Sequence, residues 1–386
     1  MEIKAELTPE ELNLSNQLKN KIVTQINQNG GAISISTYIE LALYEPNWGY
    51  YANLLHKFGK AGDFYTAPMI SNLFAQCLAK QIQELWDQSE VDRNLLEIGP
   101  GNGDLMLELL NALGDVIDNY FILEISANLT SFQRERVAQL YPQLLHKIVW
   151  LEQLPQEFEG LILANEVLDA QPTEVVVWHN NEIFQRYVTV NEKNNFVYTQ
   201  QPIKSKNLKQ VAQQLKINAD YYISEINLNN RGFMHSLAEC LNVGFILLID
   251  YGYSQNEYYA PSRFNGTLRG FFRQFQLDDV LIYPGLIDIT SSVDFTAIAN
   301  AAIQSNLDFI GFTNQGNFLI NCGLLNILQQ KHKTVNNLEY LKLAQQVKYL
   351  TAEEEMGEIF KVIAFSKKVE FSDWLGFKYN DRSHIL

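Results

Sequence analysis

The sequence predicts an α/β fold built on a mostly parallel, doubly wound sheet, and three observations lead to that prediction. From residue 94 onward, short apolar runs alternate with segments of helical periodicity, a pattern typical of parallel strands joined by crossover helices. A turn with three glycines, residues 99–103, separates one such run from an amphipathic segment. A last apolar run, residues 359–367, predicts a closing strand. The earlier strands are expected at residues 94–99, 120–125, 147–151, 160–166 and 244–252.

The N-terminal part of the chain carries the signals of helix ends. Thr8, Pro9 and Glu11 have the spacing of an N-cap, a first-turn proline and a capping-box acid. Glycines at 30–31 are expected to end this helix, and a second short helix is expected to start at Ser36. These signals predict a helical region ahead of the sheet.

An aromatic stretch follows over residues 41–71. It is too rich in Tyr, Gly and Pro for a regular element and too aromatic for a linker, so we interpret it as an ordered loop packed against a site. Helical periodicity resumes over residues 72–87. We therefore expect residues 1–90 to form a helical and aromatic-loop segment that covers the site, and residues 91–386 to form the main domain.

The main domain is expected to carry two insertions, at about residues 172–220 and 252–290. In the first, Asn180 and Asn181 have the residue types of a tight turn and predict a β-hairpin. The second is another aromatic, glycine-containing stretch, after which a helix is expected to begin near Asp294.

The composition excludes several classes of protein. A formal charge of −15, from 44 acids against 29 bases, repels a phosphate backbone and favours a cationic substrate or a basic protein surface, so we expect no nucleic-acid partner. We expect no membrane span and no export or transit signal, and the scattered histidines predict no metal site. Three widely separated cysteines fit a reducing compartment, which indicates a cytoplasmic protein.

The glycine turn is the strongest candidate for a ligand site. Gly99, Gly101 and Gly103 present bare backbone at a helix N-terminus, where unpaired N–H groups favour polar or anionic atoms. A dinucleotide fingerprint that began at Gly99 would need a glycine where the chain has Asp104. The observed spacing, preceded by Glu97, is the form used for S-adenosylmethionine, which brings no pyrophosphate. Packing alone is the alternative reason for such a turn.

Acidic and amide side chains follow the ends of neighbouring predicted strands. Glu124 ends the second strand, where an acid binds a ribose diol in doubly wound folds, although a solvated strand-end glutamate is the alternative. Asn165, Glu166 and Asp169 follow the fourth strand, and we expect them to face the donor's methyl group because ligands bind at the carboxyl ends of such strands. A helix cap is the alternative role for Asp169. Asp250, at the end of the fifth strand, is a further candidate.

Eight motifs are spread along the chain. They are ALYEPNWGYY at 42–51, GKAGDFYTAPMIS at 59–71, EIGPGNGDL at 97–105, NEVLDAQP at 165–172, LLIDYGY at 247–253, GTLRG at 266–270, DITSSVDFT at 288–296 and MGEIFKVIAFSK at 356–367. Together they resemble the MidA-like, DUF185 family of S-adenosylmethionine-dependent methyltransferases, which includes a mitochondrial complex I assembly factor that methylates an arginine on a complex I subunit.

The resemblance implies a class I, Rossmann-like methyltransferase fold, S-adenosyl-L-methionine as the donor and a protein arginine as the acceptor, on a respiratory-complex subunit. It implies Glu166 and Asp169 as acceptor-side acids, because two carboxylates orient a guanidinium through paired hydrogen bonds. A homodimer is a candidate assembly. The implied donor contacts, besides the glycine turn and Glu124, are Gly62, Asp63 and Thr66.

The chain departs from the family pattern in two places. Met69 stands where the family usually has a glutamate, and after GTLRG the residues Phe271 and Gln274 remove a hydroxyl and a titratable group. If these positions belong to the catalytic set, the activity or the acceptor differs from that of the family. If they only tune the packing of a lid, the activity and the acceptor of the family are retained. A methyltransferase fold that binds the donor without activity and a small-molecule methyltransferase are therefore alternatives, whereas Asp104 argues against a nicotinamide dehydrogenase.

Overall fold

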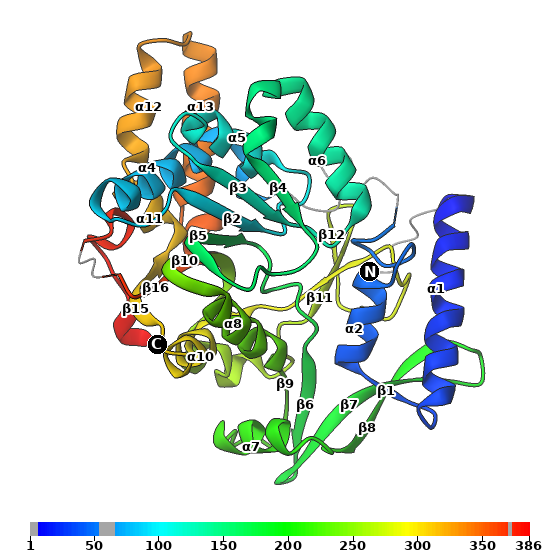
Figure 1. The fold of residues 1–386 in the computed structure, drawn as a ribbon. Helices are drawn as coiled ribbons and strands as arrows, with labels where there is room; N and C mark the ends of the chain where they lie inside the picture. Colours follow the sequence, from blue (N-terminus) through cyan, green and yellow to red (C-terminus); the bar gives the residue numbers. More distant parts are fainter. Residues whose placement is uncertain (1–6, 54–65, 370–372) are drawn as a thin grey trace. The chain divides into compact units, whose positions relative to one another are not determined.

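The computed structural model describes residues 7–53, 66–369 and 373–386 (Figure 1). Contacts divide the chain into two compact units. The larger unit comprises Tyr65–Leu168, Arg231–Gln255 and Val293–Leu386, and the smaller unit comprises Met1–Phe64, Asp169–Asn230 and Asn256–Ser292. The expected insertions at about 172–220 and 252–290 fall mostly within the second and third segments of the smaller unit.

The larger unit contains a sheet of eight strands in the order β15-β16-β10-β5-β2-β3-β4, with β14 paired to β10. The five strands from β10 to β4 are mutually parallel, as predicted, whereas β16 runs antiparallel to both of its neighbours. The parallel strands therefore end at one edge of the sheet. The strands are β2 Asn94–Ile98, β3 Asn119–Leu123, β4 Ile148–Leu151, β5 Phe158–Asn165, β10 Leu241–Tyr253, β14 Val293–Asp294, β15 Asp308–Asn314 and β16 Phe360–Lys367.

Helices cover both faces of this sheet (Figure 1). Successive strand residues point to opposite faces, so Leu95 and Leu247 belong to one apolar core and Leu96 and Leu248 to the other. The first core packs against α4, α5, α11, α12 and α13, and the second against α8 and α10. The helices are α3 Ala67–Ile70, α4 Asn72–Gln88, α5 Asp104–Leu113, α6 Ala127–Leu140, α8 Leu228–Cys240, α10 Phe295–Gln304, α11 Gln315–Asn321, α12 Leu324–His332, α13 Asn337–Thr351 and α14 Met356–Ile359.

The smaller unit contains an antiparallel sheet in the order β1-β7-β6-β9, with β8 on β7, and a three-stranded sheet β12-β11-β13. The predicted hairpin is confirmed: Asn180 and Asn181 join β6 to β7 with φ of 50° and 64°. The strands of the smaller unit are β1 Ile33–Ser34, β6 Glu174–His179, β7 Glu182–Val190, β8 Phe196–Pro202, β9 Tyr221–Ile226, β11 Arg269–Phe272, β12 Phe275–Leu277 and β13 Asp288–Thr290. Its helices are α1 Pro9–Gln28, α2 Ile35–Tyr44, α7 Lys206–Gln214 and α9 Gln255–Tyr258. The first residue of α9 belongs to the larger unit.

The predicted helix ends are confirmed in part. Thr8 and Glu11 form the predicted capping box of α1. The second helix begins one residue earlier than predicted, at Ile35, because the hydroxyl of Ser34 accepts a hydrogen bond from the Thr37 amide and caps it. The described parts of residues 41–71 are less irregular than expected, since α2 continues to Tyr44 and α3 occupies Ala67–Ile70.

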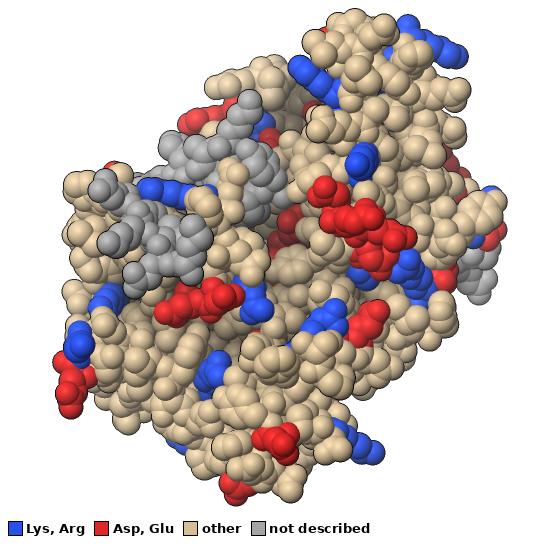
Figure 2. Space-filling model, turned by 180° about the vertical axis from the view of Figure 1, so that it is seen from behind, with Lys and Arg blue, Asp and Glu red and all other residues tan. Residues whose placement is uncertain are grey.

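Charge is dispersed on the face shown in Figure 2, where separate groups of Asp and Glu lie among Lys and Arg side chains. No helix in the described part of the chain is long and apolar enough to span a membrane.

Candidate functional site

The glycine turn connects β2 to α5 in a left-handed backbone conformation. Gly99, Gly101 and Gly103 have φ of 62°, 58° and 82°, values that side chains disfavour. A Cβ at Gly99 would lie 3.2 Å from Cγ2 of Val167, and one at Gly103 would lie 2.8 Å from Cε of Met106. The turn therefore requires glycine, and it leaves backbone exposed to a ligand at the start of α5.

Asp104, which replaces the glycine of a dinucleotide fingerprint, anchors the turn to α6. Nη1 of Arg136 lies 2.7 Å from Oδ1 of Asp104 and 2.7 Å from the carbonyl oxygen of Asn102. The ion pair gives Asp104 a structural role that the sequence pattern did not reveal. Arg136 was also missed, because a lone arginine on a helix gives no sequence signal.

Glu124 lies directly after β3, and the residue is 9% exposed. Oε1 accepts a hydrogen bond of 2.8 Å from the Ser126 amide, and Oε2 lies 3.3 Å from the Gln133 side-chain nitrogen. Burial raises the pKa of Glu124 to about 7, although these hydrogen bonds oppose the shift. Gln133 also contacts the Gly101 carbonyl, so the structure brings the predicted acid and the glycine turn together.

Glu97 lies beneath the turn, inside β2, and its side chain is buried. The Tyr120 hydroxyl donates a hydrogen bond of 2.5 Å to its Oε2. Burial, with a contribution from the charge of Glu124, raises the pKa of Glu97 to about 7. Its role as a donor contact stays a prediction.

The carboxyl ends of β5 and β10 bring Asn165, Glu166 and Asp250 into one local network. Glu166 has φ of 56°, and its amide donates a 2.8 Å hydrogen bond to the Ile249 carbonyl. The Asn165 amide group lies 3.2 Å from Glu166 Oε1. Asp250 is fully buried and accepts the Leu168 amide at 2.8 Å. Glu166 is thus a non-glycine residue that these contacts hold in a left-handed backbone conformation at the end of β5.

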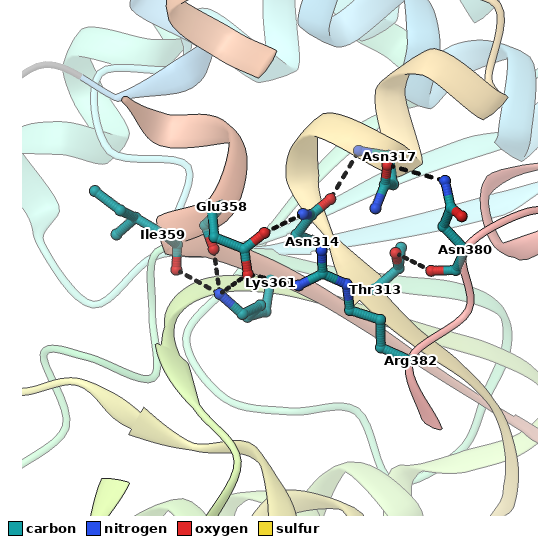
Figure 3. Close-up of polar contacts among 8 residues, drawn as sticks. All are labelled: Thr313, Asn314, Asn317, Glu358, Ile359, Lys361, Asn380 and Arg382. Carbon is teal, nitrogen blue, oxygen red and sulfur yellow. Dashed lines mark hydrogen bonds and ion pairs between the residues drawn. The ribbon is translucent and has the colours of Figure 1, made fainter. Parts of the chain in front are cut away.

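Polar side chains continue along this edge onto the antiparallel strands (Figure 3). Lys361 on β16 is paired in register with Asp250 on β10 and with Asn314 on β15. Its ammonium group contacts the Glu358 and Ile359 carbonyls and lies 3.6 Å from Glu358 Oε1. The motif at 356–367 therefore supplies a buried lysine that the sequence analysis did not single out.

Asp169 begins the second segment of the smaller unit and is buried. Its carbonyl accepts a 3.0 Å hydrogen bond from the Ser291 amide. In the same unit the Tyr51 hydroxyl donates a 2.8 Å hydrogen bond to Oδ1 of Asp288, and Tyr51 stacks on Tyr44. Burial raises the pKa of Tyr51 well above its ordinary value, with smaller contributions from Asp288, then Tyr44, then Asp169. Asp288 was missed as a site residue, although the quoted motif at 288–296 begins with it.

The remaining candidates have the following places. Gly62 and Asp63 lie outside the described residues. Thr66 is the N-cap residue of α3, the helix that contains Met69. Phe271 lies opposite Asp288 in the β11–β13 pair, and Gln274, with φ of 68°, belongs to the tight turn between β11 and β12. Among the residues that the structure describes, no group of His, Cys, Asp or Glu could hold a metal ion.

Comparison with known proteins agrees with this architecture. A family model described as "Putative S-adenosyl-L-methionine-dependent methyltransferase" matches residues 77–313. The crystal structure of a COG1565 superfamily protein of Burkholderia thailandensis bound to S-adenosyl-homocysteine is 36% identical, with a TM-score of 0.93, and the match covers 98% of this chain and 99% of that one. A native crystal structure from that organism and superfamily is 35% identical, with a TM-score of 0.91 and the same coverage of both chains.

More distant likeness extends to curated eukaryotic proteins. The Drosophila melanogaster protein named "Protein arginine methyltransferase NDUFAF7 homolog, mitochondrial" is 27% identical over 395 residues, which cover 91% of this chain and 84% of that protein. The Homo sapiens protein of the same name, without the word homolog, is also 27% identical, with coverage of 86% and 80%.

Proposed function

Since the chain belongs to the family of S-adenosyl-L-methionine-dependent methyltransferases, we propose that it methylates an arginine side chain of a protein. The predicted class I fold, the methyltransferase activity and the donor are confirmed by the family match and by the solved structure with S-adenosyl-homocysteine. The names of the curated relatives support the arginine acceptor. The observation that carries the proposal is Glu166, a carboxylate held at the end of β5 by a left-handed backbone.

The residues at the glycine turn fit the donor. Positive φ at Gly99, Gly101 and Gly103 leaves a cradle that a Cβ at Gly99 would narrow. Glu124 supplies the acceptor oxygens for ribose hydroxyls. Beside it Ile125 is 68% exposed and offers an apolar surface for the flat adenine base. The sequence analysis missed Ile125, since one apolar residue at a strand end looks like any core residue.

Methyl transfer requires little acid or base chemistry from the protein. The bound donor supplies an electrophilic methyl group on a sulfonium, and the displacement is in line. The tasks of this chain are to hold the nucleophile in near-attack geometry and to exclude water. Asn165 and Glu166 are suited to hold the acceptor at the carboxyl edge of the sheet, and Asp250 fixes the turn that carries Glu166 by accepting the Leu168 amide.

The arrangement of acids favours a guanidinium over an uncharged acceptor. A guanidinium presents a planar fork of donors that pairs with carboxylates. Glu166, at the end of β5, provides a carboxylate for such a group. Within the smaller unit, Asp169 and Asp288 are two further buried carboxylates. The Tyr51 hydroxyl donates to Oδ1 of Asp288 and holds that carboxylate in place. A respiratory-complex subunit as the acceptor, a homodimer and a cytoplasmic location stay predictions.

The test is to locate the methyl group. The purified chain is incubated with methyl-labelled S-adenosylmethionine and an extract of its own source cells, and labelled peptides are identified by mass spectrometry. The proposal expects label on arginine, lost in Glu166→Gln and retained in Glu157→Gln, which changes an exposed acid ahead of the same strand. Label on small molecules alone would contradict the proposal and favour a small-molecule methyltransferase. Donor binding with no label in any product would contradict it and favour a donor-binding protein without activity.

A further inference from the structure

Gln133 is a fully buried amide in the middle of α6. An amide without hydrogen-bond partners is costly to bury, so a buried glutamine needs a partner for each end of its side chain. In the sequence it lies on a helix of low amphipathicity, between Phe132 and Arg134, and carries no motif. Its importance comes entirely from what it contacts.

Both ends of the Gln133 side chain are bound within the larger unit. The side-chain nitrogen Nε2 lies 2.8 Å from the carbonyl oxygen of Gly101 and 3.3 Å from Oε2 of Glu124. The side-chain oxygen Oε1 lies 3.1 Å from Nε1 of Trp150 on β4. One residue therefore joins the glycine turn, the acid after β3 and the neighbouring strand.

The chemistry of Trp150 fixes which way the Gln133 amide faces. An indole N–H only donates, so it must meet Oε1 and not the amide nitrogen. The nitrogen then faces the Gly101 carbonyl and the Glu124 carboxylate, which both only accept while Glu124 is ionised. A rotated amide would set donor against donor and acceptor against acceptor, so only one orientation satisfies all three partners.

The contacts act on two parts of the donor site at once. Helix α6 holds two successive carbonyls of the flexible turn, that of Gly101 through Gln133 and that of Asn102 through Arg136. Glu124 is bound at one oxygen by the Ser126 amide and at the other by Gln133, which fixes the plane of its carboxylate. Each carboxylate oxygen has a second lone pair to accept a hydroxyl.

We propose that Gln133 is a positioning residue of the donor site: it holds the glycine turn and the Glu124 carboxylate in the single geometry that receives the donor's ribose. The proposal rests on the donor site proposed above and is independent of which acceptor is methylated. Gln133 acts through Gly101 and Glu124 and contacts no reacting atom.

The first measurement is the affinity of the full chain for S-adenosylhomocysteine by titration calorimetry. Gln133→Met keeps the length of the side chain and removes its polar atoms, and we expect the dissociation constant to rise about tenfold, as for loss of a buried hydrogen bond to a charged group. Gln139→Met, an exposed position on the same helix, is the matched control and should leave the affinity unchanged.

The second measurement is the pH dependence of that affinity. The groups that face Glu124 are the Ile125 and Ser126 amides, the Gln133 amide and, from β2, the Glu97 carboxyl. Without the Gln133 donor the ionised form of Glu124 is less stable, so the affinity of Gln133→Met should begin to fall at a higher pH than that of the parent. Gln133→Glu should be weakest above pH ~7, where a second carboxylate faces Glu124.

The outcomes separate the positioning role from the donor site itself. A folded Gln133→Met that binds S-adenosylhomocysteine like the parent, while Glu124→Ala loses affinity, overturns the proposal and leaves the donor site standing. Weaker binding with an unchanged pH profile would show a packing role and also overturn it. Unchanged affinity in Glu124→Ala would remove the donor-site assignment and the proposal with it. If Gln133→Met does not fold, the pH profile of Gln133→Glu decides the question.

Discussion

Lys361 on β16 lies directly opposite Asp250 on β10, and both side chains are buried in the sheet. Residues paired in this way in an antiparallel ladder share one face, with Cβ atoms about 5 Å apart. The ammonium of Lys361 contacts the Glu358 and Ile359 carbonyls and lies 3.6 Å from Glu358 Oε1, whereas the Asp250 carboxylate accepts the Leu168 amide. β16 thus places a buried lysine opposite the residue that fixes the turn carrying Glu166.

We predict that Lys361→Met destabilises the protein by about 1.5–3 kcal/mol, because it removes the buried ammonium that donates to the Glu358 and Ile359 carbonyls. Urea unfolding measures the change in the free energy of unfolding. If the Lys361 charge also acts on the facing Asp250 carboxylate, Lys361→Met combined with Asp250→Asn should recover part of the loss. Purely additive effects of the two changes would show that the residues are not coupled.

The C-terminal segment should confer stability that depends on pH. Burial acts to raise the pKa of Glu358, but hydrogen bonds from Arg382 and Asn314 and the charges of Lys361 and Arg382 outweigh it, so the pKa is lowered (Figure 3). A lowered pKa contributes stability above the unfolded-state value, and this is lost as pH falls through the folded-state value.

Arg382→Met should therefore reduce the melting temperature at neutral pH and leave it nearly unchanged at pH ~3. The pair is partly exposed, with side chains 32% and 36% accessible, so the effect should stay near ~0.5–1 kcal/mol. Lys378→Met, a neighbouring cation without a carboxylate partner among the described ion pairs, is the control. An equal loss at both pH values would argue against the ion pair.

Donor affinity should decrease as pH falls through about 7. Ribose hydroxyls donate to an ionised carboxylate, and burial raises the pKa of Glu124 to about 7, so protonation below that value removes the acceptor. Calorimetry in buffers of different ionisation enthalpy should show that binding at pH ~6.5 releases a proton. Binding without proton release at that pH would mean that Glu124 is not the ribose ligand.

Tyr51→Phe should reduce turnover about tenfold and leave donor affinity unchanged, because it removes the hydrogen bond to Asp288 and nothing at the glycine turn. The measurement compares turnover with the dissociation constant of S-adenosylhomocysteine. Tyr253→Phe, on β10, is a comparison at another tyrosine. A parallel loss of donor binding in Tyr51→Phe would contradict an acceptor-side role.

Gly101→Val should abolish donor binding, since a branched side chain is strained at φ of 58° and would occupy the exposed backbone of the turn. Gly232→Ala is the control, because a Cβ there meets no described atom within 4 Å. Calorimetry with S-adenosylmethionine measures both. Undiminished binding by a folded Gly101→Val would exclude the turn as the donor site.

The sequence alone determined the parallel strands of the sheet and the candidate ligand edge at their carboxyl ends. Short apolar runs, glycine spacing and caps are local properties, so the parallel strands, the turn at Gly99 to Gly103 and the hairpin at Asn180 and Asn181 could be predicted from neighbouring residues. The motif order then indicated the methyltransferase family. The second helix start was misplaced because Ser34 and Ser36 are both plausible caps by residue type, and only the hydrogen bond to Thr37 distinguishes them.

The tertiary structure decided which polar side chains, distant in the sequence, form hydrogen bonds with one another. The motifs do not show this. Gln133 stands in no motif and Lys361 was not singled out within its motif, yet each lies against a residue of the predicted site because a crossover helix, antiparallel pairing and buried hydrogen bonds bring it there. Burial also raised the pKa of Glu124, a property of the surrounding protein and not of the residue. The sequence thus specified the candidate groups for the donor site, while packing specified their orientation and charge.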